Sequence, residues 1–204
     1  MPSIIQQLNE SLANRISDVH ESLVQISNGR GAGAGTIWHA DGLIITNAHV
    51  IRGHHGLNVT LTDGRKFPAS VIAADDQLDL AALSINADNL PTIKTGDSRG
   101  LKAGHWVMAV GHPWGVQGAV TSGVVIGVGD QLPEMGQMQP GREWIALSLH
   151  MRPGHSGGPV IDSEGKLVGI NTMITGPDVG FAIPVHVVKT FLKEAIGSKA
   201  ATAI

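Results

Sequence analysis

Frequent turn signals divide the sequence into short apolar runs, and this pattern limits the fold more than any other feature. From Ser22 onward the runs alternate with glycine turns such as Asp41-Gly42 and Asp63-Gly64, which favour β-hairpins. Six candidate strands lie at residues 23–27, 34–38, 43–46, 57–61, 66–73 and 80–85. Because little room remains between them for helices, the pattern predicts an antiparallel sheet or barrel.

The second half of the chain repeats this pattern after a polar, glycine-rich linker at residues 94–104. Its candidate strands lie at residues 106–110, 117–128, 144–149, 159–162, 167–173 and 179–183, with a loop at 129–141. Apolar residues at helical spacing predict one helix at the N-terminus and another over 185–196 that ends at Gly197. The expected organisation is a helical segment (1–21), a first barrel with linker (22–104), a second barrel (105–184), and a helix with tail (185–204).

Composition excludes several classes of protein. The chain has 204 residues, of which 42% are hydrophobic and 15% charged, as in globular proteins. A net charge of −3 without long charged runs argues against a nucleic-acid partner. The absence of cysteine rules out disulfides, a thiol nucleophile and thiolate metal sites. We find no membrane span and no signal peptide in the sequence, and expect a cytoplasmic chain, or a periplasmic or secreted one if the sequence is a mature form.

The motif Gly-His-Ser-Gly-Gly-Pro at residues 154–159 is the densest chemical feature of the chain. Glycines on both sides of a serine allow a sharp turn and a close approach to a ligand. Such a turn can present a hydroxyl nucleophile together with the backbone N–H groups of an oxyanion hole. The same residues contain Gly-x-Ser-x-Gly, the elbow of a different hydrolase fold, so the partners of Ser156 must decide between the two.

Two residues of the first half are candidates for these partners. His49 ends one apolar strand and Asp79 opens another, and each taken alone is explained as a strand-end, turn or cap residue. Together with Ser156 they follow the chain order His, Asp, Ser, which suits a two-barrel serine protease with its site between the barrels. The elbow fold needs the serine first and a helix directly after it. Residues 159–170 instead have the pattern of a hairpin, so we reject the elbow.

On these residues the chain resembles trypsin/chymotrypsin-type serine proteases, and specifically the protease domain of the HtrA/DegP family. The matching stretches follow the family order at residues 46–50, 79–81, 96–98, 111–115, 120–123, 154–159, 169–172 and 180–184. The resemblance implies an all-β, trypsin-like fold of two six-stranded antiparallel β-barrels with N-terminal and C-terminal helices. It implies a serine endopeptidase for polypeptide substrates, in protein quality control or regulated proteolysis, that needs no cofactor and no metal.

The resemblance also implies roles for individual residues. Ser156 is the expected nucleophile, His49 the base, and Asp79 the residue that orients the imidazole. The expected oxyanion hole consists of Gly154, His155 and Ser156. The expected substrate-binding residues are His150, Met151, Ile170, Asn171 and Thr172.

Two histidines depart from the family pattern. His155 stands where the family has asparagine, either as a solvent-facing substitution or as a pH-dependent charge near the site. His150 stands where a small residue usually forms the base of the primary specificity pocket, and it could shorten that pocket or favour acidic side chains. We interpret His54 and His55 as loop residues, because no His-Glu-x-x-His spacing indicates a metal site.

Two questions stay open at the level of sequence. A protease fold can also serve as a catalytically silent scaffold or a chaperone-like binding protein, because function depends on the site and not on the barrel. Relatives form trimers through aromatic N-terminal contacts, whereas only 3% of this chain is aromatic. A homo-oligomer and a monomer therefore both remain possible.

Overall fold

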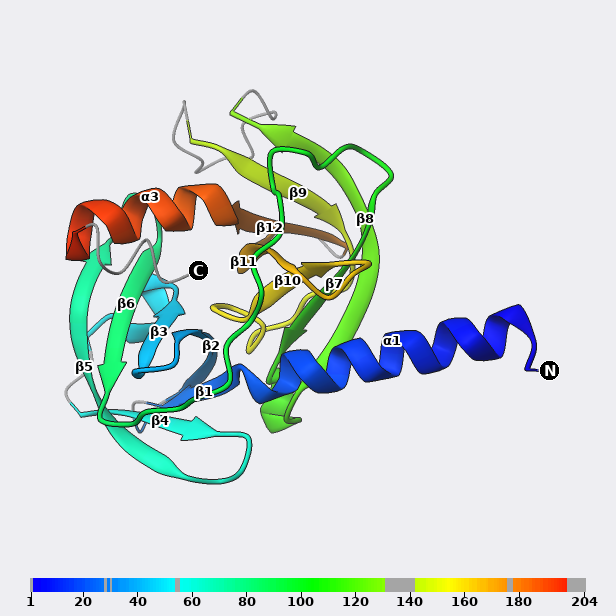
Figure 1. The fold of residues 1–204 in the computed structure, drawn as a ribbon. Coiled ribbons are helices and arrows are strands. Elements are labelled where there is room, and N and C mark those ends of the chain that lie inside the picture. The colour runs from blue at the N-terminus through cyan, green and yellow to red at the C-terminus, as the bar shows by residue number, and fades with distance from the viewer. Residues whose placement is uncertain are drawn as a thin grey trace.

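Two closed antiparallel barrels form the molecule, which confirms the expected fold class (Figure 1). The structure is a computed structural model that describes residues 2–27, 29, 31–53, 56–130, 142–175 and 178–197. Within these residues the first barrel has the strand order β1-β2-β3-β6-β5-β4 and closes through pairing of β1 with β4. Its strands are β1 (Leu23–Ser27), β2 (Ala32–His39), β3 (Leu43–Thr46), β4 (Leu57–Leu61), β5 (Lys66–Asp75) and β6 (Leu80–Ile85).

The second barrel has the order β10-β11-β12-β9-β8-β7 and closes through pairing of β10 with β7. Its strands are β7 (Trp106–Gly111), β8 (Ala119–Gly129), β9 (Trp144–Ser148), β10 (Pro159–Asp162), β11 (Leu167–Thr175) and β12 (Val179–Pro184). Each strand expected from the sequence has a counterpart in one of the barrels. The expected loop at 129–141 and the tail after Gly197 lie almost entirely outside the described residues.

The turn between β2 and β3 shows why the hairpin signals were reliable. Gly42 has a φ of +89°, in the left-handed region that favours glycine. A Cβ atom added there would lie 2.3 Å from the carbonyl oxygen of Ile85. The turn therefore needs glycine for both its conformation and its close approach to β6.

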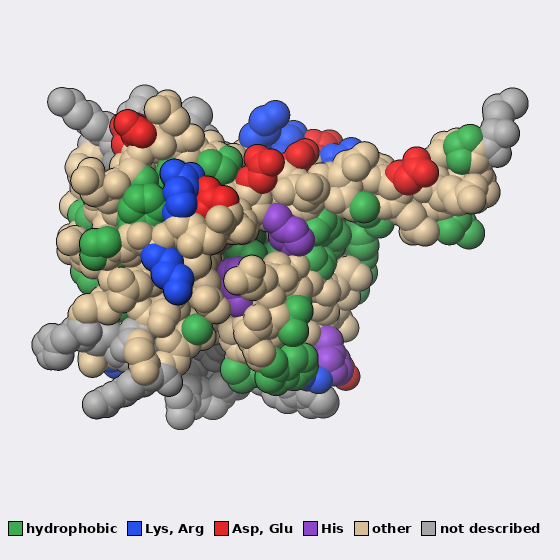
Figure 2. Space-filling view, turned by 90° about the horizontal axis from the view of Figure 1, so that it is seen from below, with side chains coloured by type: hydrophobic (Ala, Val, Ile, Leu, Met, Phe, Trp, Pro, Cys, Tyr) green, Lys and Arg blue, Asp and Glu red, His purple; other side chains and the backbone are tan. Residues whose placement is uncertain are grey.

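Helices flank the barrels, as expected, and two short helices were not foreseen. The long helices are α1 (Ile4–Glu21) and α3 (Val185–Ile196); the short ones are α2 (Ala48–Ile51) and the 3₁₀-helix η1 (Pro113–Gly115). α1 begins with a capping box of Ser3 and Gln6. It projects beyond the barrels, with hydrophobic side chains at its free end (Figures 1 and 2). Among the described helices, none is long and apolar enough to cross a membrane.

One apolar core joins the two barrels. Leu23, Ile45 and Leu80 of the first barrel belong to the same buried cluster as Leu167 and Ile183 of the second. The buried face of α3 completes this cluster and contacts strands of both barrels. Because packed interiors resist deformation, this core fixes the position of residues on the first barrel relative to residues on the second.

Candidate active site

His49 and Asp79 are held together on the first barrel. His49 lies on α2, directly after β3, and Asp79 lies in the turn between β5 and β6. Nδ1 of His49 is 3.0 Å from Oδ1 and 2.9 Å from Oδ2 of Asp79. The backbone N–H of His49 also donates to Oδ1, at 3.0 Å. The carboxylate therefore fixes the imidazole orientation and favours a proton on Nδ1, which leaves Nε2 for proton transfer.

The second barrel holds the other side of this carboxylate. The Thr172 hydroxyl, on β11, donates a hydrogen bond to Oδ2 of Asp79. Burial raises the pKa of Asp79, but the hydrogen bonds from His49 and Thr172 outweigh burial and hold this pKa below its ordinary value. Asp79 is therefore ionised near neutral pH, as a partner of a histidine base must be.

The glycine that follows Ser156 is required by close packing between the barrels. Gly157 has a φ of +83°, and a Cβ there would lie 2.1 Å from the carbonyl oxygen of Ala34. The carbonyl of Ser156 accepts a hydrogen bond of 2.9 Å from the N–H of Ala34, on β2 of the first barrel. On the other side, the N–H of Gly157 donates to the carbonyl of Asn171 at 2.9 Å. Hydrogen bonds to β2 and to β11 thus fix the serine turn from both sides.

Ser156 and His49 line the same cavity, which has a volume of about 250 Å³ and includes Gly33, Val50 and Gly154 in its wall. The hydroxyl of Ser156 donates to the carbonyl oxygen of Thr172 at 3.0 Å. Among the hydrogen bonds of the described residues, none joins this hydroxyl to His49. The structure therefore brings the three candidate catalytic residues to one place, with the serine hydroxyl turned toward Thr172.

The backbone donors of the serine turn are not equivalent. The N–H of His155 donates to the carbonyl of Arg152 at 3.0 Å, within the loop itself. Within the described part of the chain, no carbonyl accepts from the N–H of Gly154 or of Ser156. A developing oxyanion could therefore be bound by these two groups. The backbone N–H of His155 is used within the loop, and its expected place in the oxyanion hole stays a prediction.

The His155 side chain is buried, which contradicts the hypothesis of a solvent-facing substitution. The residue is only 3% exposed, and Nδ1 lies 3.1 Å from the backbone N and O of Arg152. Burial lowers the pKa of His155, with a further lowering by the charge of Arg152. Burial also lowers the pKa of the neighbouring His112, as do the charges of His20 and His155. Both imidazoles are therefore neutral near neutral pH, and the backbone N–H of His112 donates to the carbonyl of Gly154 in the serine turn at 2.8 Å.

The expected substrate-binding residues differ in how far they are buried. His150 lies at the surface, where its Nδ1 pairs with the carboxylate of Asp178. Met151 is buried, and a Cβ added at Gly180 would lie 2.3 Å from its Cε. The side chains of Ile170 and Asn171 are fully buried in the second barrel. Thus Met151, not His150, packs into the interior next to Gly180 of β12.

Sequence reasoning missed three contacts with the Asp79 segment. Asn47 Nδ2 donates to the carbonyl of Asp79 at 2.9 Å, and Arg142 donates to the carbonyl of Leu78. Thr172 was expected only as a substrate-binding residue. Asn47 and Thr172 lie in stretches that match the family pattern, so a signal for them existed. For Arg142 the sequence holds no such signal.

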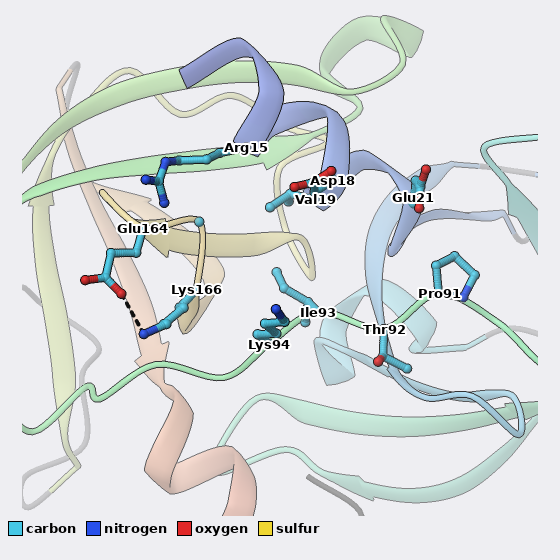
Figure 3. Close-up of a pocket in the computed structure, with 11 residues that line it drawn as sticks. Arg15, Asp18, Val19, Glu21, Pro91, Thr92, Ile93, Lys94, Glu164 and Lys166 are labelled. Carbon is cyan, nitrogen blue, oxygen red and sulfur yellow. Dashed lines mark ion pairs between the residues drawn. The ribbon is translucent and has the colours of Figure 1, made fainter. Parts of the chain in front are cut away.

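A larger cavity, of about 600 Å³, lies on another part of the surface (Figure 3). It lies between α1 and the segment after β6, and none of the three candidate catalytic residues lines it. Lys166 Nζ and Glu164 Oε2 form an ion pair of 2.6 Å at its wall (Figure 3). Within the described residues, no group of three or more His, Asp or Glu side chains could hold a metal ion. His54 and His55 lie outside the described residues.

Comparison with known proteins gives matches at the level of sequence and structure. Residues 33–170 match the model of the trypsin-like peptidase domain. The chain is 41% identical over 163 residues to a probable periplasmic serine endoprotease DegP-like of Halomonas elongata, covering 78% of this chain and 34% of that protein. It is 37% identical over 165 residues to the mitochondrial serine protease HTRA2 of Drosophila willistoni, covering 80% of this chain and 38% of that protein.

The solved structure of the HtrA-type protease AlgW with a tripeptide superimposes with a TM-score of 0.81 and 31% identity. This match covers 92% of the present chain and 64% of the AlgW chain. The present chain spans little more than a third of the length of the curated relatives named above. The similarity to these proteins is thus a similarity to their peptidase part.

Proposed function

This chain belongs to the trypsin-like peptidase domain family, with relatives of the HtrA/DegP type, and we propose that it is a serine endopeptidase. In this proposal Ser156, His49 and Asp79 form a catalytic triad that hydrolyses peptide bonds through an acyl-enzyme. One observation carries the proposal. The carboxylate of Asp79 binds both the backbone N–H and Nδ1 of His49, and His49 lines the same cavity as Ser156.

The first step forms the acyl-enzyme. The Ser156 hydroxyl turns from the carbonyl of Thr172 to Nε2 of His49, which takes its proton as Oγ attacks the substrate carbonyl carbon. The resulting imidazolium is stabilised by the ionised carboxylate of Asp79. When the tetrahedral intermediate collapses, the C–N bond breaks and the leaving amine receives the proton from His49. Water then attacks the ester by the same sequence and releases the acid.

The negative charge of the tetrahedral intermediate needs donors that are already in place. The N–H groups of Gly154 and Ser156 meet this need, because no described carbonyl accepts from them. The loss of one such donor typically lowers the rate by about 10²–10³-fold. The His155 N–H stabilises the loop that presents these donors.

The proposed substrates are exposed or unfolded segments of polypeptides, cleaved in protein quality control or regulated proteolysis. This part of the proposal rests on the family resemblance and on two relatives, a probable serine endoprotease and a serine protease. It also rests on the fold shared with an HtrA-type protease solved with a tripeptide. The proposal holds for a monomer and for a homo-oligomer such as the trimer of relatives.

A second candidate function is a catalytically silent scaffold or chaperone-like binder. It is favoured by the hydrogen bond that the Ser156 hydroxyl donates to the carbonyl of Thr172 and not to His49. A peptidase assay on an unfolded protein substrate separates the two functions, with Ser156→Ala as the matched variant. The proposal requires cleavage by the wild type and a loss of several orders of magnitude in the variant. Binding of the substrate without cleavage by either protein would favour the scaffold.

A further inference from the structure

Arg142 connects the second barrel to the turn that carries Asp79. It lies just before β9, and its Nη2 donates a hydrogen bond to the carbonyl oxygen of Leu78. Leu78 directly precedes Asp79 in the turn between β5 and β6 of the first barrel. An arginine of one barrel therefore holds the peptide next to the carboxylate of the other.

The guanidinium of Arg142 is itself fixed in place. Its Cζ lies 3.8 Å from the ring centroid of Trp144, which is buried. Its Nε is buried and has no hydrogen-bond partner among the described residues. Burial lowers the pKa of Arg142 to about 10, while the charges of Asp79 and Asp75 raise it. The group thus stays charged near neutral pH, and its stacking leaves few other orientations for the donor.

The peptide that Arg142 holds controls the conformation of Asp79. Asp79 has a φ of +54°, which residues other than glycine adopt rarely. The carbonyl of Leu78 and the N–H of Asp79 belong to one planar unit, so a fixed carbonyl also restrains this φ. Within the turn itself, Asp75 Oδ1 accepts from the N–H of Gln77 and of Leu78, both at 2.8 Å. Arg142 adds a hydrogen bond from the second barrel that restrains the same turn.

We propose that Arg142 is a positioning residue that keeps the carboxylate of Asp79 directed at His49 by holding the Leu78–Asp79 peptide. The inference rests on the proposed function, because it assigns a role within the proposed triad. Arg142 acts through Asp79 and touches no reacting atom. It also lies outside every stretch by which the chain resembles its family, so the resemblance assigns it no role.

Arg52, which follows α2, provides a matched control because it contacts the same turn. Its Nη2 donates to Oδ1 of Asp76 at 2.7 Å, but the side chains are 65% and 72% exposed. Exposed ion pairs of this kind contribute little. The Arg52→Met variant therefore removes a guanidinium contact from the same turn without releasing the Leu78 carbonyl.

The experiment compares the wild type with Arg142→Met, Arg142→Lys and Arg52→Met. It measures kcat and KM on a peptide substrate and the downfield NMR signal of the His49 Nδ1 proton, assigned by ¹⁵N-histidine labelling. We expect Arg142→Met to lower kcat by about 10²-fold, because small displacements of catalytic groups have effects of this size, and to leave KM nearly unchanged. The proton signal should move upfield or broaden. Arg142→Lys should recover part of both readouts, and Arg52→Met should match the wild type.

Two results would overturn the proposal. One is an Arg142→Met enzyme with the kcat and proton signal of the wild type. The other is a lower kcat with an unchanged proton signal, which would indicate general structural support. If Arg142→Met does not fold, Arg142→Lys and Arg142→Gln take its place. Wild-type kcat and proton signal in both would then count against the inference, and lowered values in Arg142→Gln with partial recovery in Arg142→Lys would support it.

The proposed function and this inference can fail separately. If the wild type cleaves no peptide, the endopeptidase proposal fails. The His49 proton signal still tests the role of Arg142 in that case, because the hydrogen bond between His49 and Asp79 does not depend on turnover. A shifted signal in Arg142→Met would support the positioning role even in an inactive scaffold, and an unshifted signal would reject it.

Discussion

The hydroxyl of Ser156 donates a hydrogen bond of 3.0 Å to the carbonyl oxygen of Thr172. The hydroxyl of the same Thr172 donates to the carboxylate of Asp79. One residue of β11 therefore contacts both ends of the proposed triad. Its backbone carbonyl binds the hydroxyl of Ser156, and its side-chain hydroxyl binds the carboxylate of Asp79.

Thr172→Val should lower the stability of the folded protein and disturb the proposed triad. It removes the donor to Asp79 and keeps the shape of the side chain. A hydrogen bond to a charged group contributes about 1.5–3 kcal/mol, so we expect a loss of this size in the free energy of unfolding at pH 7. The pKa of Asp79 lies below its ordinary value in the folded protein. The stabilisation from Asp79 is therefore present above the unfolded-state pKa and is lost as the pH falls through the folded-state pKa.

Urea unfolding at pH 7 and near pH 3 tests this prediction, with Thr172→Ser as the control that retains the hydroxyl. The difference between Thr172→Val and the wild type should shrink at the lower pH. An equal difference at both pH values would show that packing, and not the hydrogen bond to Asp79, causes the loss.

His155→Asn should make stability less dependent on pH in the acidic range. The pKa of the buried His155 is lowered on folding from its ordinary value of 6.5. The unfolded state therefore binds more protons below about pH 6.5, and wild-type stability should fall as the pH drops from there toward the lowered pKa. The fall should be smaller in the variant.

Denaturant unfolding between pH 7 and pH 5 checks the role of His155. The exposed His105 is the control residue, and His105→Asn should follow the wild type. Parallel stability curves for the wild type and His155→Asn would contradict the prediction. If the pH–rate profiles of these two proteins also superimpose, His155 has no role in pH-dependent activity.

Gly157→Ala should destabilise the protein through strain and through a clash. The left-handed conformation costs about 1–2 kcal/mol for a residue with a Cβ, and overpacking adds about 1–3 kcal/mol. Gly104→Ala is the matched control, because Gly104 has a φ of +90° but no heavy atom within 4 Å of an added Cβ. Thermal or urea unfolding should therefore show a larger loss for Gly157→Ala. Equal losses would mean that the contact with Ala34 does not limit this turn.

Asp178→Ala should change which residue is accepted before the scissile bond. In the wild type the Asp178 carboxylate pairs with His150, so an acidic substrate side chain would compete with it for the same partner. Removal of Asp178 should raise cleavage after Asp and Glu in a peptide library, and the double variant with His150→Ala should lose this gain. An unchanged cleavage profile in Asp178→Ala would remove His150 from the expected substrate-binding residues.

The strands and the three candidate catalytic residues were predictable because each is marked by a short local sequence pattern. Alternating apolar residues and the Asp41-Gly42 turn determine a hairpin within a few residues of sequence. The helix α2 was missed because four residues are too few to show helical periodicity. This short helix nevertheless turns His49 toward Asp79.

The details of the site depend on contacts between distant segments. Arg142 and Leu78 are separated by 64 residues, and Thr172 and Asp79 by 93. No local pattern could predict these pairs, because each arises only when the two barrels pack together. The burial of His155 also depends on a distant segment, but within the second barrel, since Gly111 on β7 packs directly against its backbone.

Covalent labelling with a fluorophosphonate probe tests the central claim most directly, because these reagents need a serine that is activated by a histidine. Mass spectrometry should locate one adduct on Ser156 of the wild type. Ser156→Ala and His49→Ala should give none at the same reagent concentration. The absence of an adduct on the folded wild type, or wild-type labelling of Ser156 in His49→Ala, would contradict a functioning triad.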